Sequence, residues 1–272
     1  MSMRTPLDEK EQRLLEYLRQ QLNVMIAFSG GVDSTYLMTI AQEALGDKAK
    51  GVLFKGTMLA QEEAKEAVAL AEVFHFPLVV LEMDMFQVEG FVANAPERCY
   101  FCKTAIFQKL LAYGQATGVA TVLDGTNASD EGDYRPGRKA LAELGIGSPL
   151  KTLGLTKEEI RELSRRRGLP TWNKPSMACL ASRIPYGERI TEARLRQVEQ
   201  AEDFLRSQGF RGLRVRTHQD LARIEVPLGD FPRLLAIQKE VNAAFHQFGL
   251  RYITLDLEGL RSGSLNPAEG QA

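Results

Sequence analysis

A glycine-containing turn near the N-terminus has the residue types of a phosphate-binding loop. Ser29-Gly30-Gly31-Val32-Asp33-Ser34 follows an apolar run and precedes a stretch typical of a helix. Backbone N–H groups at a helix start, left open by glycines, form a nest for anions along the helix dipole. Ser29 and Ser34 can add hydroxyl donors, and the Asp33 carboxylate can hold Mg²⁺ between phosphates. The turn lacks the lysine of a Walker A motif and the spacing of the dinucleotide fingerprint, so it is a different phosphate-binding device.

The three cysteines are the second group that could do chemistry. Cys99 and Cys102 have C-x-x-C spacing at the start of a predicted helix, and Cys179 lies much later in the chain. A helix N-terminus favours thiolate over thiol. Zinc would need a fourth ligand, and the three histidines have no recognisable ligand spacing. Three thiolates suit a [4Fe–4S] cluster with one open iron. A redox-active disulfide with an inert Cys179, or three merely buried thiols, are the alternatives.

Alternating strand and helix patterns must position these groups. Apolar runs at residues 24–28, 51–55, 78–83 and 119–123 predict strands, and the stretches between them favour helices. This alternation predicts an α/β fold: a parallel sheet with helices on both faces. Such sheets bind ligands at the carboxyl ends of their strands. The turn at residues 29–34 and the polar segment Asp124-Gly125-Thr126-Asn127 should therefore lie at the same edge.

After residue 154 the pattern changes. Thr156 and Glu159 form a capping-box signature for a helix that runs to Arg167, and residues 171–187 look irregular. The rest of the chain predicts helices at residues 191–207 and 231–248 and strands at residues 213–217, 222–226 and 252–257. We therefore expect a domain at residues 1–186 and a smaller α/β domain at residues 187–272 that serves substrate binding and oligomerisation.

Composition and charge narrow the function classes. The 272-residue chain has a net charge of −1 and three cysteines, which are too few for a disulfide framework. No apolar run approaches the roughly 18 residues of a membrane-spanning helix, and the N-terminus does not resemble a signal peptide. We expect a cytoplasmic protein that makes no membrane contact. Between Arg161 and Arg223 there are 14 basic and 7 acidic residues, which favours an anionic partner.

The pattern S-G-G-x-D-S after an apolar strand resembles the PP-loop of the ATP pyrophosphatase superfamily. In that superfamily the loop grips the pyrophosphate of ATP while a nucleophile attacks the α-phosphate and forms an adenylate. The D-G-T-N segment is similar to the nucleotide-side loop of the same superfamily, although alone it would be an ordinary polar loop. The resemblance implies that the following residues bind ATP: Ser29, Gly30, Gly31, Asp33, Ser34, Asp124, Gly125 and Asn127.

Further strings resemble one PP-loop family closely and cover nearly the whole chain, from the first predicted helix to the region of Gly263. They are Asp133-Tyr134-Arg135-Pro136-Gly137, Trp172-Asn173-Lys174, Ser182-Arg183-Ile184-Pro185-Tyr186-Gly187, Leu213-Arg214-Val215-Arg216, Ala222-Arg223-Ile224-Glu225 and Tyr252-Ile253-Thr254-Leu255-Asp256. The family is LarE, the ATP-dependent sulfur transferase of nickel-pincer nucleotide cofactor biosynthesis. The resemblance implies that ATP and Mg²⁺ adenylate a carboxylate of pyridinium-3,5-biscarboxylic acid mononucleotide. Sulfur then displaces AMP and leaves a thiocarboxylate.

LarE enzymes obtain their sulfur in two ways, and the cysteine positions indicate which applies. One branch sacrifices a single cysteine in a W-N-K-x-x-S-C-like string, where this chain has Ala178 followed by Cys179. Cys99 and Cys102 also replace non-cysteine residues of that branch. The resemblance therefore implies the second branch, in which Cys99, Cys102 and Cys179 hold a [4Fe–4S] cluster and act in catalysis with Asp33. Cys179 as a sacrificial donor stays open.

The nucleotide substrate needs partners for its phosphate and carboxylate groups. Arg214 and Arg216 alternate along a predicted strand and so face the same way, where two guanidinium groups can bind a phosphate. A solvated strand edge is the alternative. The family resemblance assigns both arginines, with Arg183, to the substrate. Glu225 and Asp230 match acidic positions of the family's substrate region, which a homo-oligomer is expected to share.

Three rival functions remain at this point. A tRNA thiolase of the superfamily could use the same cysteines, but a net charge of −1 without a basic domain argues against a nucleic-acid partner. A non-catalytic module could bind ATP or AMP without releasing pyrophosphate. An amide-forming ligase would use ammonia in place of sulfur. The source of sulfide cannot be read from the residues.

Overall fold

The computed structural model describes residues 5–119, 121–130, 136–175, 178–261 and 265 of the chain. It consists of two compact units. The first comprises Met1–Asp84 and Cys99–Met177, and the second comprises Met85–Arg98 and Ala178–Ala272. The sequence-based division at residues 186 and 187 stays a prediction.

The first unit alternates strands and helices, as the sequence predicts. Its strands are β1 (Val24–Ala27), β2 (Ala49–Lys55), β3 (Leu78–Glu82) and β4 (Thr121–Leu123). Its helices are α1 (Pro6–Arg19), α2 (Val32–Leu45), α3 (Gln61–Val73), α5 (Arg98–Thr117, which begins with the last residue of the second unit's insert), α6 (Pro136–Glu143), α7 (Pro149–Thr152) and α8 (Lys157–Arg166). Short 3₁₀ helices are η1 (Gly46–Lys48) and η3 (Ala128–Asp130).

The strands form a parallel sheet in the order β3-β2-β1-β4. In the register, Val24 at the start of β1 pairs with Ala49 of β2 and with Thr121 of β4. Because all strands run the same way, the loops after β1, β2 and β4 leave from one edge of the sheet. The parallel α/β fold predicted from the sequence is confirmed.

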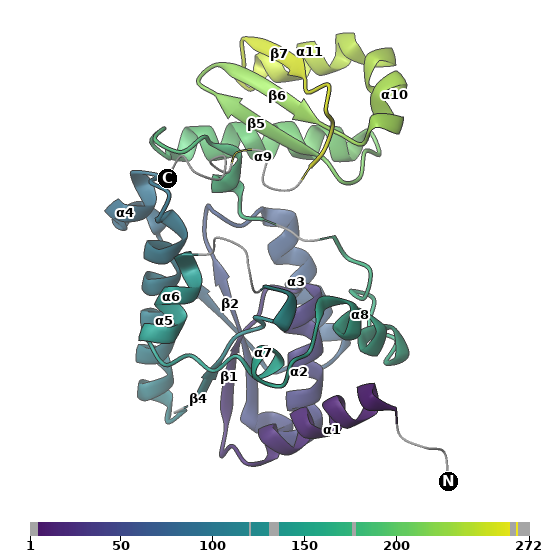
Figure 1. The fold of residues 1–272 in the computed structure, drawn as a ribbon. Helices are drawn as coiled ribbons and strands as arrows, with labels where there is room; N and C mark the ends of the chain where they lie inside the picture. The colour runs from purple at the N-terminus through teal and green to yellow at the C-terminus, as the bar shows by residue number, and fades with distance from the viewer. Residues whose placement is uncertain (1–4, 120, 131–135, 176–177, 262–264, 266–272) are drawn as a thin grey trace. The chain divides into compact units, whose positions relative to one another are not determined.

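Helices cover both faces of this sheet, and side chains of β1 alternate between the two cores. Val24 and Ile26 pack in the core that α1, α2, α3 and α8 share, whereas Met25 packs with α5 and α6. Figure 1 shows the two groups of helices on opposite sides of β1 and β2. Because β1 is buried on both faces, its sequence is apolar without alternation.

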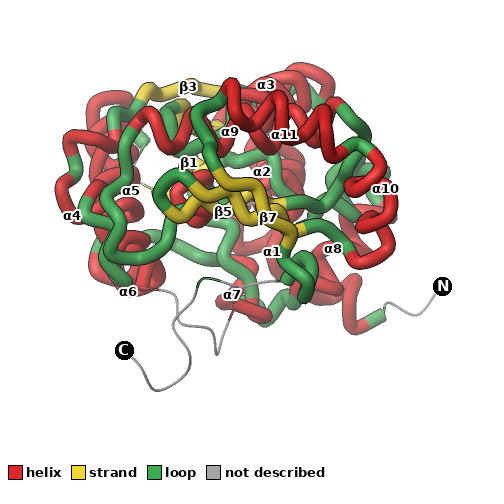
Figure 2. Tube along the Cα trace, turned by 90° about the horizontal axis from the view of Figure 1, so that it is seen from above, coloured by secondary structure: helices red, strands yellow, loops and turns green. Residues whose placement is uncertain are grey.

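The second unit contains a three-stranded sheet in the order β5-β6-β7. β5 (Arg214–His218) and β6 (Leu221–Glu225) are antiparallel, and β7 (Tyr252–Leu255) runs parallel to β6. The unit's helices are α4 (Glu89–Val92), α9 (Glu192–Ser207), α10 (Phe231–Ala236) and α11 (Gln238–Gln247), with 3₁₀ helices η2 (Met85–Gln87), η4 (Leu180–Arg183) and η5 (Leu228–Asp230). Figure 2 shows β5 and β7 in yellow and the labelled helices in red.

The core of the second unit lies on one face of its sheet. Val215, Ala222 and Ile224 pack with apolar side chains of α9, α10 and α11. Successive strand residues point to opposite faces. The neighbours Arg214, Arg216, Arg223 and Glu225 therefore share the other face, which explains why charged residues interrupt these strands.

One expectation about the helices needs correction. The single helix expected at residues 231–248 is two helices, because Ile237 leaves the helical conformation (φ −107°, ψ 23°) between α10 and α11. The short helices α4, α6 and α7 were not anticipated, since each buries only two or three residues. Among the described residues, no helix combines the length and apolar character needed to cross a membrane.

Candidate active site

The glycine turn lies where β1 passes into α2, at the carboxyl edge of the parallel sheet. Ser29 N–H donates to Ser34 Oγ, and the two hydroxyl oxygens are 3.1 Å apart. Gly31 is the residue that precedes α2, and no side chain caps the first turn there. The N–H groups at this helix start therefore have no capping side-chain acceptor, and the positive end of the helix dipole points into the turn.

Gly30 is required by both its conformation and its neighbours. Its φ of +68° is disfavoured for residues with a side chain, and a Cβ atom would lie 2.9 Å from the Cβ of Ala67 in α3. The turn is thus pressed against α3. A side chain at Gly30 would displace either the turn or the helix, so this glycine sets the shape of the anion nest.

Asp33 forms an ion pair with a lysine from α8. The Lys157 ammonium lies 2.6 Å from Asp33 Oδ2, and both side chains are largely buried. Burial raises the pKa of the Asp33 carboxyl above its ordinary value, and Lys157 lowers it only in part. Asp33 Oδ1 is buried and accepts no hydrogen bond within the described residues. An orphaned carboxylate oxygen beside a phosphate nest fits Mg²⁺, a cation that prefers oxygen ligands.

Lys174 brings a second ammonium group to the same turn. Its Nζ donates to the carbonyl oxygen of Gly30 at 3.2 Å and pairs with Glu66 at 2.9 Å. Arg161 holds this segment in place by donating to the carbonyl oxygens of Trp172 and Lys174. The turn therefore has two cationic side chains, in addition to the helix dipole, with which to bind a polyphosphate.

The D-G-T-N segment after β4 is packed directly against the glycine turn. A Cβ atom on Gly125 would lie 3.2 Å from the backbone nitrogen of Ser34, so a side chain there would require the glycine turn to shift by a few tenths of an ångström. Asp124 is buried and accepts hydrogen bonds from Thr126 and Ser148, while Asn127 Oδ1 accepts from the N–H of Ser129. In the structure Asp124 and Asn127 shape the loop that adjoins the phosphate nest.

The cysteines are divided between the two units. Cys99 and Cys102 lie in the first turn of α5, and Cys102 Sγ is 3.8 Å from the sulfur of Met58. Cys179 immediately precedes η4 in the second unit. All three are thiols of intermediate exposure. Within the described residues, neither unit contains three His, Cys, Asp or Glu side chains arranged to hold a metal ion. The three-cysteine cluster stays a prediction.

The segment that carries Cys179 is bound by arginine side chains. Arg183 Nη1 donates to the carbonyl oxygens of Ala178 and Cys179, and Arg216 Nη1 donates to that of Ser182. Both arginines are nearly inaccessible, at 2% and 4% exposure. Before any substrate is bound, these two guanidinium groups therefore hold the main chain around the cysteine.

Two buried carboxylates hold these arginines. Glu202 of α9 makes a bidentate pair with Arg183, at 2.8 and 3.0 Å, and Glu225 makes one with Arg216. Burial raises the pKa of the Glu202 carboxyl, but its arginine partners outweigh that effect and the net pKa lies below its ordinary value. Both pairs are buried, so removal of either carboxylate takes away the counterion of a buried arginine.

Arg214 is more accessible than Arg183 and Arg216. Burial, together with the neighbouring Arg183 and Arg216 charges, lowers the pKa of Arg214 to about 10, so its guanidinium stays cationic at pH 7. A third positive charge beside two others favours an anionic ligand. Asp230, by contrast, is placed by η5 and the start of α10 and not by the strands that carry the arginines.

Known proteins similar to this chain cover it almost completely. A family model described as NAD synthase matches residues 9–96. An uncharacterised protein of Synechocystis is 39% identical over 263 residues, covering 96% of this chain and 98% of that protein. An uncharacterised protein of Methanocaldococcus jannaschii is 29% identical over 239 residues, covering 88% and 91%. The pyridinium-3,5-bisthiocarboxylic acid mononucleotide synthase of Lactiplantibacillus plantarum is 38% identical over 264 residues, covering 96% and 95%.

This chain belongs to the LarE family of pyridinium-3,5-bisthiocarboxylic acid mononucleotide synthases. The resemblance inferred from the sequence is therefore confirmed, as is the expectation of an ATP-dependent enzyme with a PP-loop. Part of one string that carried the LarE resemblance, Asp133-Tyr134-Arg135, lies outside the described residues, as do Ser176 and Met177 between Lys174 and Cys179.

Sequence reasoning missed three residues of this LarE chain that the structure places around the predicted sites. Lys157 was interpreted only as part of a capping box, and Lys174 only as part of a family string. A lysine in the first turn of a helix is disfavoured by the helix dipole, so the position of Lys157 could have indicated a role outside the helix. The sequence around Glu202 gave no such indication, because the burial of Glu202 depends on how α9 packs against the rest of the unit.

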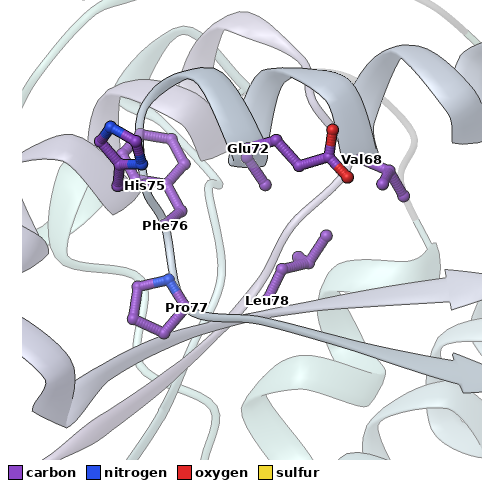
Figure 3. A pocket seen from close by; sticks show the side chains of 7 residues that line it. Val68, Glu72, His75, Phe76, Pro77 and Leu78 are labelled. Carbon is purple, nitrogen blue, oxygen red and sulfur yellow. The ribbon is translucent and has the colours of Figure 1, made fainter.

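A hollow of the first unit lies away from these residues. A cavity of about 540 Å³ lies between the end of α3 and the start of β3, as Figure 3 shows. Its lining includes Glu72, His75 and Pro77. Because the sheet is parallel, the start of β3 lies at the edge opposite the glycine turn. This cavity is therefore separate from the predicted ATP site.

Proposed function

We propose that this enzyme converts a carboxylate of pyridinium-3,5-biscarboxylic acid mononucleotide to a thiocarboxylate at the expense of ATP, in nickel-pincer nucleotide biosynthesis. The observation that carries the proposal is the uncapped first turn of α2 with Asp33 and Lys157 beside it. This arrangement provides an anion nest, a carboxylate for Mg²⁺ and a cation at one place. The membership in the LarE family adds the substrate class.

The first step is adenylation. The substrate carboxylate oxygen attacks the α-phosphorus of ATP, the bond to the β-phosphate bridging oxygen breaks, and pyrophosphate leaves with the bonding electrons. The N–H groups of residues 32–34, Lys157 and Lys174 would stabilise the charge that develops on pyrophosphate. Asp33 would hold Mg²⁺ against the same phosphates. The product is an acyl-adenylate with a good leaving group.

The second step exchanges AMP for sulfur. A hydrosulfide attacks the acyl carbon, AMP leaves with the electrons of the broken C–O bond, and the thioacid releases its proton to solvent. Thiolate-type sulfur is a better nucleophile at neutral pH than water or an amine. Arg214 would hold the substrate phosphate, while Arg183 and Arg216 shape the site around Cys179.

For the sulfur source we propose Cys99, Cys102 and Cys179 as ligands of a [4Fe–4S] cluster. Such a cluster leaves one iron open, where a sulfide can bind. The donor type supports this, because all three residues are thiols of intermediate exposure and Cys99 and Cys102 share one helical turn. A homo-oligomer in the cytoplasm, with Glu225 and Asp230 at a shared substrate region, completes the proposal.

The test follows pyrophosphate, AMP and thiocarboxylate in anaerobically purified protein given ATP, Mg²⁺, sulfide and the dicarboxylate mononucleotide. The wild type should contain about four irons per chain and form one pyrophosphate per thiocarboxylate. Cys99→Ser, Cys102→Ser and Cys179→Ser should each lose thiocarboxylate formation and keep pyrophosphate release. Saturable ATP binding without pyrophosphate would mean a binding module instead.

Other outcomes assign the rival functions. If only Cys179→Ser loses the product, and the wild-type protein becomes lighter by one H₂S per turnover, Cys179 is a sacrificial donor. Product formation from ammonia in the absence of all three thiols would identify an amide-forming ligase. Thiolation of tRNA with steep salt dependence would identify the tRNA thiolase.

A further inference from the structure

A lysine of α1 binds the start of α8 on both sides of Lys157. Lys10 Nζ donates to the carbonyl oxygen of Gly154 at 2.6 Å, three residues before Lys157. It also donates to both carboxylate oxygens of Glu159, two residues after Lys157, at 2.8 and 2.7 Å. An ammonium group has three donor hydrogens, so these contacts can use all of them. Lys10 therefore joins the turn before α8 to the first turn of the helix.

Glu159 carries the Lys10 contact into the cap of α8. Its Oε2 accepts from the N–H of Thr156 at 2.9 Å, and its own N–H donates to Thr156 Oγ1 at 3.2 Å. This capping box satisfies two N–H groups that the helix itself leaves without an acceptor. Because Lys10 binds the same carboxylate, α1 is attached directly to the residues that define where α8 begins.

The main chain of Lys157 is held from the sheet edge as well. Its N–H donates to Ser129 Oγ at 2.9 Å, and Ser129 lies just after the D-G-T-N segment. Its ammonium lies 2.6 Å from Asp33 Oδ2. The helix dipole disfavours a cation in this first turn, so the turn must be fixed by other contacts. Lys10 and Ser129 provide them, and all of these residues belong to the first unit.

Stability alone is a poor explanation for the Lys10 contacts. The side chains of Lys10 and Glu159 keep 29% and 30% of their exposure, and an ion pair open to solvent contributes little to the free energy of unfolding. A long, flexible lysine side chain nevertheless pays entropy to hold three acceptors at once. What the contacts provide is a fixed position for the first turn of α8.

We propose that Lys10 is a positioning residue for the ATP-dependent step, because it anchors the first turn of α8 and so places the Lys157 ammonium at the glycine turn before ATP binds. This inference rests on the proposed function, in which Lys157 stabilises the departing pyrophosphate. The hydrogen bonds of Lys10 go to Gly154 and Glu159, so Lys10 acts through Lys157 and not on the reacting atoms.

The test combines Lys10→Met with Lys157→Met and measures pyrophosphate release from ATP, Mg²⁺ and the dicarboxylate mononucleotide. Lys10→Met should lower kcat about 10-fold, because a group misplaced by about 1 Å loses much of its effect on the rate. In the Lys157→Met background the same substitution should change kcat less than about 2-fold, since both substitutions act through one ammonium group. A purely structural lysine would lower kcat by the same factor in both backgrounds.

Binding of inorganic pyrophosphate gives a second readout that needs no chemistry. In calorimetric titrations with Mg²⁺, Lys10→Met should bind pyrophosphate about 10-fold more weakly than wild type, because a hydrogen bond between charged groups is displaced. Lys157→Met should also bind it more weakly. Adding Lys10→Met to Lys157→Met should cause no further loss of affinity.

Arg166→Met is the matched control. Arg166 pairs with Asp8 of α1 at 3.2 Å, so it too joins α1 to α8, but from the last residue of the helix. Its removal should leave kcat and pyrophosphate affinity unchanged in both backgrounds. Lys10→Arg keeps the charge and can pair with the Glu159 carboxylate through two donors, so it should restore most of the rate.

Glu159→Gln replaces Lys10→Met in the cycle if Lys10→Met does not fold. Glutamine also serves in a capping box, so this variant keeps the helix start and loses only the negative charge that Lys10 binds. It should lower kcat in the wild-type background and leave kcat unchanged beside Lys157→Met.

The outcomes separate this inference from the proposed function. Equal kcat and equal pyrophosphate affinity in wild type and Lys10→Met, or the same loss in both backgrounds, overturn the role of Lys10 and leave the proposed function intact. A wild-type protein that binds ATP without releasing pyrophosphate overturns the proposed function, while the binding cycle still tests Lys10. Full pyrophosphate release and affinity in Lys157→Met would overturn this inference, and thiocarboxylate formation would still test the proposed function.

Discussion

Lys157 and Asp33 form an ion pair of 2.6 Å across 124 positions of the chain. Asp33 belongs to the helix that follows the glycine turn, and Lys157 opens α8. Both side chains are mostly buried, with exposed fractions of 24% for Lys157 and 21% for Asp33. The proposed function requires this pair to open when ATP binds, so that Lys157 reaches phosphate and Asp33 reaches Mg²⁺.

Lys157→Met should lower ATP-dependent pyrophosphate release about 100-fold, because one preorganised cationic donor to the leaving group is lost. Burial already raises the pKa of Asp33, and loss of the lysine raises that pKa further. The acidic limb of the pH–rate profile should therefore move to higher pH in the variant. Lys65→Met, at an exposed lysine of α3, is the control. Equal rates in both variants would contradict the role of Lys157.

Gly30→Ala should be more destabilising than Gly154→Ala. Both glycines have φ near +70°, which costs a residue with a Cβ about 1–2 kcal/mol. Only Gly30 also lacks space, since its Cβ would lie 2.9 Å from that of Ala67. We expect an additional 1–3 kcal/mol, roughly, for this overpacking. Urea unfolding of the two variants measures the difference, and equal midpoints would argue against a close contact between the turn and α3.

Glu202→Gln should destabilise the protein by about 3–5 kcal/mol at pH 7, because Arg183 keeps its buried charge without a counterion. The folded-state pKa of Glu202 lies below its ordinary value of 4.5. Its contribution to the free energy of unfolding is thus present above pH 4.5 and is lost as the pH falls through the folded-state pKa. Wild type and variant should converge below pH 4.5.

Glu192→Gln is the control for this comparison, because Glu192 pairs with Arg196 on an exposed face of the same helix. It should change the unfolding free energy by no more than about 0.5 kcal/mol at any pH. A constant difference between Glu202→Gln and wild type from pH 7 down to pH 3 would mean that the carboxylate charge of Glu202 does not stabilise the fold.

Arg214→Met should raise the KM for the mononucleotide about 10- to 100-fold, since a hydrogen bond between charged groups is lost. Arg214→Lys should restore only part of the affinity, because a single ammonium cannot replace a planar fork of donors. The exposed Arg211 provides the control variant, Arg211→Met. An unchanged KM, with the KM for ATP as reference, would exclude Arg214 from the substrate site.

The alternating strands and helices of the first unit could be predicted because each one has a recognisable pattern in its own residues. The apolar run before Ser29 marks the strand β1. The glycines that follow Ser29 mark the turn and the start of the helix α2. The helix expected at residues 231–248 was wrong, since the departure of Ile237 from helical geometry has no glycine or proline to announce it. Local patterns predict the kind of element better than its interruptions.

Order along the chain, residue spacing and family strings were enough to predict a phosphate nest and to select the cysteines and arginines as candidates. The partners of these residues depend on contacts between segments remote in sequence, such as Lys157 with Asp33 or Arg98 with Ala181. Spacing reports which side chains share a strand or a helical turn, because that geometry is local. Which charges become buried together, and which carboxylate compensates each, follows only from how the helices pack on the sheets.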